Sequence, residues 1–211
     1  MRHEFYAILT PFHKVPNILL VKIGYTWRIL MEENRNAMKS ACNFMDVKPI
    51  MMDLPYPPLQ VREKNQYYAN LLSVDYCGAV SEMSAITQYI NNENRLASQR
   101  CPIAKTLLGI AMAEMIHLQK LGELIVLLGG CIDFTAKQND GRRKMWTPEY
   151  LDIPENVNKM ILADIEAERG AIKQYKAHIN AIKDDCVNAV LARIIKDEEY
   201  HIMLLQCLLD R

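Results

Sequence analysis

The feature that most constrains the fold of this chain is an internal repeat. The octapeptide EMSAITQY at residues 82–89 returns as ERGAIKQY at residues 168–175, with the Glu, Ala, Ile, Gln and Tyr positions identical. A Glu-x-x-His sequence follows in both copies, 32 residues after the first glutamate in one and 30 residues after it in the other. The pattern therefore predicts two copies of one helical hairpin, with Glu-x6-Tyr on the first helix and Glu-x-x-His on the second.

The two Glu-x-x-His sequences are Glu114 with His117, and Glu198 with His201. A spacing of three residues places both side chains on one face of a helix. The apolar residues around them keep the same helical spacing, so we expect the polar pairs to point into the interior. A buried carboxylate needs a partner or must stay protonated at a considerable cost in free energy. A divalent metal is one efficient partner for several carboxylates.

Folding the two hairpins together about a pseudo-twofold axis would bring four carboxylates and two imidazoles to one place, which is the ligand set of a dinuclear iron or manganese site. The predicted metal ligands are Glu82, Glu114, His117, Glu168, Glu198 and His201.

Two tyrosines accompany this set. Tyr89 and Tyr175 lie seven residues, or two helical turns, beyond the first glutamate of each octapeptide. We expect each hydroxyl to hydrogen-bond a carboxylate from a facing helix and to serve catalysis by fixing its orientation.

The two predicted metal positions are not expected to be equivalent. Asp197 is a candidate acceptor for an imidazole N–H, but its counterpart in the first copy is Ala113, which cannot accept one. Glu168 is the ligand with the closest competitors, because Asp164 and Glu166 are nearby; the octapeptide repeat favours Glu168.

Residues outside this set are expected to have structural roles. We interpret His178 as an exposed helix residue rather than a third imidazole ligand. We expect Trp146 to cover apolar surface of the bundle, with capping of the metal pocket as the alternative.

The helical pattern predicts an all-α fold, an antiparallel four-helix bundle with one long crossover. Short links within each hairpin favour antiparallel neighbours, and the polar connection at residues 131–153 is long enough to run the length of the bundle. The four helices are expected at about residues 65–97, 102–129, 155–183 and 185–209.

The chain is expected to divide into an N-terminal extension, residues 1–60, and the bundle, residues 61–211. A helix is predicted at about residues 25–43 of the extension. The prolines of KPIMMDLPYPPLQ then make a linker without regular structure.

Composition excludes several classes of partner. The 25 basic and 25 acidic residues cancel, so no nucleic-acid partner is indicated. The N-terminus is not a good signal peptide and no apolar run is expected to span a membrane, which favours a soluble, cytoplasmic protein. None of the six cysteines forms a Cys-x-x-Cys pair, so no zinc ribbon or rubredoxin-type iron site is predicted. We expect the cysteines to be packing residues in a reducing compartment.

These motifs resemble the ferritin-like superfamily, in particular rubrerythrins, bacterioferritins and manganese catalases. SEMSAITQY is similar to the first-helix segment of bacterioferritins and DEEYHI to their last-helix metal motif, within a resemblance that covers roughly residues 65–210. It implies a ferritin-like bundle in which the same six residues bind two iron ions, or alternatively two manganese ions. There is no rubredoxin module, so a rubrerythrin-like reaction would need a separate electron donor. Only ten residues follow His201, too few for the fifth helix of cage-forming ferritins.

The expected function is that of a non-haem di-iron oxidoreductase acting on hydrogen peroxide or dioxygen, as a homo-oligomer, most simply a dimer. A manganese catalase is a close variant, and iron is preferred over manganese. Two alternatives stay open: iron storage, which requires a large hollow assembly, and a helical interaction protein in which the metal only stabilises the bundle.

Overall fold

The computed structural model describes residues 43–137 and 142–209, so the helix predicted at residues 25–43 lies, except for its last residue, outside the described part. The elements in this part are α2 (Gln66–Cys77), α3 (Glu82–Leu96), α4 (Cys101–Leu127), β1 (Thr135–Lys137), β2 (Arg143–Met145), a short 3-10 helix η1 (Pro148–Tyr150), α5 (Val157–Ala181) and α6 (Asp185–Leu209).

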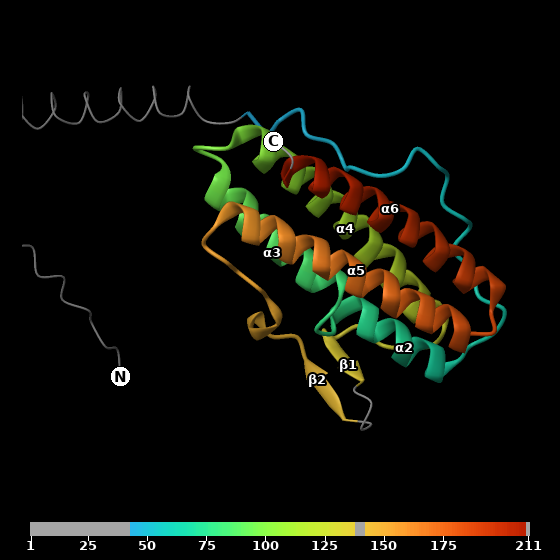
Figure 1. Cartoon of the computed structure of the whole chain (residues 1–211). Helices are drawn as coiled ribbons and strands as arrows, with labels where there is room; N and C mark the ends of the chain where they lie inside the picture. Colours follow the sequence, from blue (N-terminus) through green and yellow to red (C-terminus); the bar gives the residue numbers. More distant parts are fainter. Residues whose placement is uncertain (1–42, 138–141, 210–211) are drawn as a thin grey trace, which may run out of the picture. The chain divides into compact units, whose positions relative to one another are not determined.

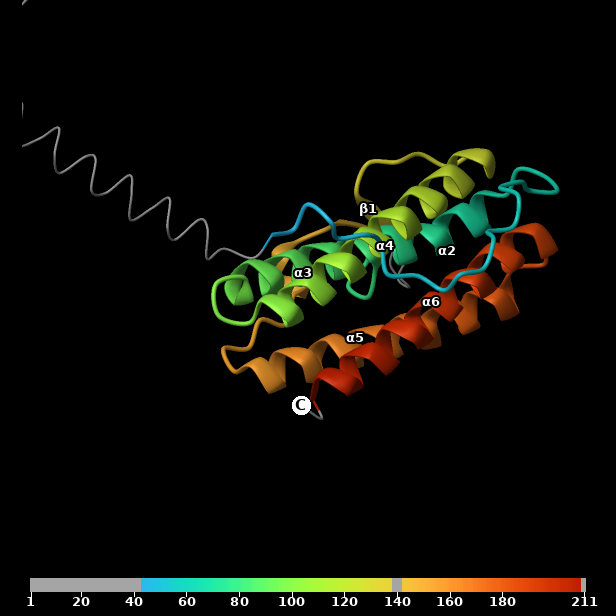
Figure 2. The ribbon, with the colours of Figure 1, turned by 90° about the horizontal axis from the view of Figure 1, so that it is seen from above.

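The architecture is the predicted helical bundle of two hairpins. α3 packs most extensively on α4, and α5 on α6. Seen from above, α5 and α6 form one layer and α2, α3 and α4 the other (Figure 2). The connection between α4 and α5 runs the length of the bundle, as predicted, and brings the second hairpin beside the first (Figure 1).

This connection is more regular than the sequence indicated. β1 and β2 pair antiparallel, with Thr135 opposite Met145, and Arg143 donates to the carboxylate of Asp133 at 2.6 and 2.8 Å. Strands of three residues are too short to give a recognisable period of two, so the pattern did not predict them.

The single helix predicted at residues 65–97 is wrong, because it is broken between α2 and α3. Gly78 ends α2 in extended backbone, where an added Cβ would lie 2.6 Å from the carbonyl oxygen of Val74. Ser81 then caps α3, accepting a hydrogen bond from the N–H of Ser84. The break makes Glu82 the first residue of α3.

Two apolar clusters form the core, with Tyr175 of the repeat in the first and Tyr89 in the second. One is centred on Leu72, Leu121, Leu124, Val190, Leu191 and Ile194. The other includes Leu107, Ile110, Met160, Ile161 and Leu205.

A proline-rich segment lies along the bundle, and we call residues 48–62 the strap. The strap has no helix or strand, as predicted, but it is bound to the helices along its length (Figure 1). The Ile50 N–H donates to the Gly109 carbonyl at 2.9 Å, and the Arg62 N–H donates to Asp184 at 2.7 Å. By its contacts, the strap belongs to the same compact unit as the helices.

Within the described residues, α4 is the one helix long and apolar enough to cross a membrane by length and composition. In this fold α4 is a central helix of the bundle. It carries the buried Glu114 and His117 in its middle and packs on α2, α3 and α6. Part of its apolar surface, including Met115, Val126 and Leu127, is exposed.

The cysteines differ from expectation at one position. Cys101, the first residue of α4, is disulfide-bonded, so the prediction that the cysteines are packing residues is wrong for this one. Cys77, Cys131, Cys186 and Cys207 are free.

Candidate metal centre

The structure brings all six predicted ligands together in the middle of the bundle, one pair from each of α4 and α6 and one glutamate from each of α3 and α5. They form two groups, in each of which the possible ligand atoms lie within 4.8 Å of one another. Glu114 and Glu198 belong to both groups, as bridging carboxylates do. The first group adds Glu82 and His117, and the second adds Glu168 and His201. Each of the six is at most 3% exposed.

Both imidazoles present the same nitrogen to the carboxylates. Nδ1 of His117 lies 2.7 Å from Glu114 and 3.4 Å from Glu198. Nδ1 of His201 lies 3.0 Å from Glu114 and 3.1 Å from Glu198. The two bridging carboxylates therefore each face both rings, whose centres are 6.1 Å apart.

Both tyrosines make the predicted contacts. The hydroxyl of Tyr89 on α3 donates to Glu168 on α5, and the hydroxyl of Tyr175 on α5 donates to Glu82 on α3. Each tyrosine of one repeat thus holds the non-bridging glutamate of the other, and both side chains are buried.

Three buried atoms of the cluster lack a hydrogen-bond partner. These atoms are Oε1 of Glu114, Oε2 of Glu198 and Nδ1 of His201, and all three point at one another. Buried polar atoms in a folded protein are nearly always satisfied. A cation with these atoms as ligands would satisfy all three at once, so the donor set fits a metal.

The charges of the cluster are unbalanced without a cation. Burial, and then the charge of Glu114, raises the pKa of the Glu82 carboxyl well above its usual range. Burial and the charge of Glu198 do the same to the pKa of Glu168. Burial alone would lower the pKa of His117, but the surrounding carboxylates, Glu198 first, raise it well above the usual range. Without a metal, protons on these groups thus balance the negative charge that two divalent cations would otherwise neutralise.

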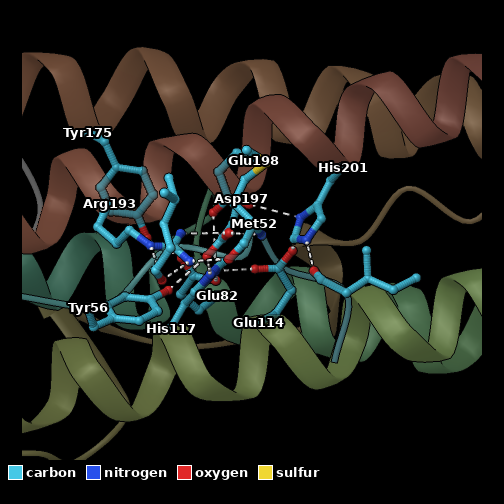
Figure 3. A network of polar contacts seen from close by, with 12 residues as sticks. Met52, Tyr56, Glu82, Glu114, His117, Tyr175, Arg193, Asp197, Glu198 and His201 are labelled. Carbon is cyan, nitrogen blue, oxygen red and sulfur yellow. Dashed lines mark hydrogen bonds and ion pairs between the residues drawn. The ribbon is translucent and has the colours of Figure 1, made fainter. Parts of the chain in front are cut away.

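The far nitrogen of His117 is held by Asp197, the residue that the sequence indicated. Nε2 lies 3.1 Å from Oδ2 of Asp197, which also accepts from the hydroxyl of Tyr56 at 2.9 Å (Figure 3). The other oxygen accepts from the Met52 N–H at 2.7 Å and pairs with Arg193 at 2.7 Å. Burial alone would raise the pKa of Asp197, but the hydrogen bond with His117 first, and then those from Arg193 and the Met52 N–H, lower it to about 2. An ionised Asp197 keeps the proton on Nε2 and leaves Nδ1 free for a metal.

The far nitrogen of His201 has a different partner. Its Nε2 donates to the carbonyl of Ile50 in the strap at 2.8 Å. One imidazole is therefore held by a carboxylate and the other by a neutral carbonyl, in agreement with the predicted inequivalence of the two halves.

The strap residues Ile50, Met52 and Tyr56 were missed by the sequence analysis, which took them as part of a linker. Their contacts join residues 141 to 151 positions apart in the chain, a separation that no local pattern reports. Arg193 offered one signal, since it stands four residues before Asp197 on the same helix face.

The competing carboxylates lie outside the cluster. Asp164 accepts from the amides of Gln88 and Asn92, and Glu166 is exposed and paired with Arg169. The predicted preference for Glu168 agrees with this arrangement.

The two other residues singled out in the sequence have specific contacts. Trp146 donates its indole N–H to Ser84 at 3.0 Å, beside the cavity described next. The side chain of His178 is mostly buried and contacts Asp75 on α2, so the expectation of an exposed helix residue is wrong.

A cavity of about 680 Å³ leads to the cluster between α3, α5 and the crossover. Four of the predicted ligands line it: Glu82, Glu114, Glu168 and Glu198. Small side chains such as Ala163, Ala167 and Ala171 line the α5 side, which leaves the carboxylates accessible to a small molecule.

The fold and the cluster together define a ferritin-like protein of the di-metal carboxylate class. A model of the Rubrerythrin family matches residues 78–209, and the chain belongs to this family.

Individual proteins are similar to this chain at low sequence identity. The "Probable manganese catalase" of Clostridium acetobutylicum is 23% identical over 170 residues, covering 72% of this chain and 75% of the relative. The crystal structure of KatB, a manganese catalase from Anabaena PCC7120, superposes with a TM-score of 0.66 at 25% identity, covering 75% of this chain and 78% of KatB. A structure of wild-type KatB gives a TM-score of 0.64 at 24% identity. These relatives support an oxidoreductase of the di-metal type.

Proposed function

We propose that this protein is a di-metal enzyme that disproportionates hydrogen peroxide, with manganese as the metal that its relatives favour. The observation that carries the proposal is the pair of ligand groups sharing Glu114 and Glu198 at the end of an accessible cavity. The sequence alone favoured iron over manganese. The order is reversed here because the relative is named a probable manganese catalase and the similar crystal structures are of a manganese catalase.

The donor set suits two divalent ions. Four carboxylates carry a charge equal and opposite to that of two such ions, and carboxylate with imidazole is a suitable environment for manganese as well as iron. When bound, the two ions would store the two electrons that pass from one peroxide molecule to the next. Glu114 and Glu198 would hold the ions together, and Glu82 and Glu168 would each complete one side.

The remaining residues fix these ligands and control access. Tyr89 and Tyr175 each donate to one of the non-bridging glutamates, which keeps one carboxylate oxygen in place. Asp197 and the Ile50 carbonyl keep Nδ1 of each imidazole directed at the centre. The helices bury these groups, and the cavity admits a small uncharged substrate such as hydrogen peroxide.

The test is metal analysis of the purified protein followed by addition of hydrogen peroxide. Release of oxygen without any reductant would support the catalase. Consumption of peroxide only with an electron donor would instead support an iron peroxidase, the second candidate, which the Rubrerythrin family match favours. A protein that binds no metal would refute both. The double variant Glu114→Gln/Glu198→Gln is the control for contaminating catalase, since it keeps the shape of the site and removes the two shared charges.

Gel filtration tests the iron-storage alternative, and melting with and without a chelator, together with turnover, tests the alternative of a metal that only stabilises the bundle. Iron storage requires a large hollow assembly, whereas the expected homo-oligomer is small. A metal that only stabilises the bundle predicts melting after chelation, but no turnover.

A further inference from the structure

The octapeptide repeat contains a glutamine that the metal centre does not explain. In both copies this glutamine donates its amide to a buried aspartate on another helix. Gln88 donates to Asp164 at 2.8 Å, and Gln174 donates to Asp75 at 2.8 Å. Both aspartates are 1% exposed. Two buried carboxylates therefore flank the centre, one from each half of the repeat.

The second partner of each aspartate differs between the halves. Four residues after Gln88, the amide of Asn92 donates to Asp164 at 3.1 Å. At the equivalent position, four residues after Gln174, stands His178, whose Nδ1 lies 2.7 Å from Asp75. An amide cannot gain or lose a proton near neutral pH, whereas an imidazole can.

The two aspartates also differ in access to the cavity. Asp75 lines the cavity that reaches Glu82 and Glu198, whereas Asp164 is not among the residues that line it. The break between α2 and α3 accounts for the difference, because Ala79 and Val80 of the break line the same cavity. Asp164 lies instead within the continuous helix α5.

The outer end of the Asp75 pair reaches solvent. The side chain of His178 is 12% exposed, and its Nε2 has no hydrogen-bond partner among the described residues. His178 lies in the last turn of α5, where the helix dipole favours a positive charge. Burial raises the pKa of Asp75, although its bonds to His178 and Gln174 act in the opposite sense.

We propose that Asp75 and His178 form a proton store for the cavity, which supplies a proton while peroxide is reduced and takes one back while peroxide is oxidised. This inference rests on the proposed function and adds to it a role for two residues outside the ligand set. The opposite pair, Asp164 with Asn92, has no such role and only joins α3 to α5.

Each half of the reaction moves two protons, and the pair would handle one of them. Reduction of one hydrogen peroxide breaks the O–O bond and consumes two electrons and two protons, giving two waters. Oxidation of the next releases two protons and two electrons, giving dioxygen. In the first half the imidazolium of His178 passes its Nδ1 proton to Asp75, which passes it to a substrate oxygen in the cavity; the second proton of this half comes from solvent water, and the second proton released in the other half returns to solvent. The second half returns a proton by the reverse route, so the neutral imidazole becomes imidazolium again.

The experiment uses the full chain loaded with manganese and hydrogen peroxide as substrate. His178→Ala should lower turnover on the order of 100-fold, the usual contribution of a positioned proton donor, with the metal content unchanged. Added imidazole should restore part of the lost turnover, because the position is partly open to solvent. The variant should also change the solvent deuterium isotope effect. Asp75→Asn should lower turnover in the same way, without rescue by imidazole.

The matched controls are Asn92→Ala and Asp164→Asn in the other half, which should leave turnover unchanged. A second readout does not depend on turnover: proton NMR should show a downfield Nδ1–H resonance from His178 that Asp75→Asn abolishes. Full turnover in His178→Ala, or loss without rescue together with loss of metal, would overturn the proton store and leave the proposed function standing. A wild-type protein inactive toward peroxide would instead refute the proposed function, and the store with it.

Discussion

Nε2 of His117 lies 3.1 Å from Oδ2 of Asp197, and this contact crosses from α4 to α6, joining the two halves of the repeat. Asp197 is fully buried and holds four groups at once, including the strap. The orientation of an imidazole in one hairpin therefore depends on a carboxylate in the other. The equivalent imidazole, His201, depends on a backbone carbonyl instead.

The first prediction follows from this difference. Asp197→Asn removes the charge that fixes the proton on Nε2 of His117, but leaves the carbonyl partner of His201 in place. Loss of such an outer hydrogen bond typically costs about 10- to 100-fold in metal affinity. We expect weaker binding of one metal and unchanged binding of the other, measured by metal titration. Equal weakening of both would contradict the assignment.

The second prediction concerns the two imidazoles themselves. His117→Ala and His201→Ala should each lose about one metal ion per chain, because each ring belongs to only one of the two ligand groups. Elemental analysis of the purified variants measures this. His178→Ala is the matched control, since His178 belongs to neither group, and it should keep the wild-type content. Two ions per chain in both ligand variants would show that the ligand assignment is wrong.

The bundle and the convergence of the six residues were predictable because the repeat shows the same ligand positions in two helical hairpins. The same spacing of Glu, Tyr and Glu-x-x-His occurs twice, and a pair of equal hairpins has few ways to bury it. The octapeptide glutamine was visible in the same alignment, but its role was not. Asp75 and Asp164, its two acceptors, lie at different distances from the repeat and share no motif.

The strap and the helix break could not be read from the sequence in the same way. The Ile50 carbonyl reaches His201 through backbone geometry, which leaves no signature in residue types. Gly78 and Ser81 did carry a local signal, a glycine followed by a capping serine. It was outweighed by the helical pattern on either side.

The third prediction tests the strap. In Gly109→Val the first added carbon would lie 2.7 Å from the Ile50 side chain and 3.1 Å from the Lys48 carbonyl. Overpacking of this kind costs about 1–3 kcal/mol, so the free energy of unfolding should fall. The displaced strap should also release Nε2 of His201 and weaken metal binding there. Chemical denaturation and metal titration measure the two effects.

Gly170, which also lies within a helix, supplies the control for Gly109. A Cβ at this position meets only Val80, at an ordinary 3.4 Å. Replacing a mid-helix glycine by alanine gains about 0.5–1 kcal/mol, so Gly170→Ala should be more stable than wild type and bind metal normally. If Gly109→Val behaved like this control, the strap would have no part in holding His201.

The fourth prediction concerns the tyrosines. Tyr175→Phe removes the hydrogen bond to Glu82 and keeps the ring in the core, and Tyr89→Phe does the same for Glu168. We expect turnover of peroxide to fall about 10-fold or more while both metals stay bound, because each hydroxyl orients a ligand without being one. Steady-state kinetics with parallel metal analysis tests this. Unchanged turnover in both variants would show that the two tyrosines serve only as core residues.

The fifth prediction is the pH dependence of stability without metal. Burial and neighbouring carboxylates raise the pKa of Glu82 and Glu168 in the folded chain, and the carboxylates raise the pKa of His117 and His201. A group whose pKa is raised by folding stabilises below its unfolded pKa, and this stabilisation is lost as the pH rises through the folded value. The opposite shift of Glu114 acts only at acidic pH, below its ordinary 4.5.

The metal-free protein should therefore lose stability as the pH rises above the ordinary glutamate value of 4.5 and further above the ordinary histidine value of 6.5. Metal ions replace the bound protons, so the loaded protein should keep its Tm over the same range, and the difference between the two forms should grow with pH. Thermal melts with and without a chelator, in a series of buffers above pH 6.5, measure both forms. A metal-free Tm that rose with pH would mean that the cluster does not hold these protons. Metal binding could then not act by displacing protons from these four groups.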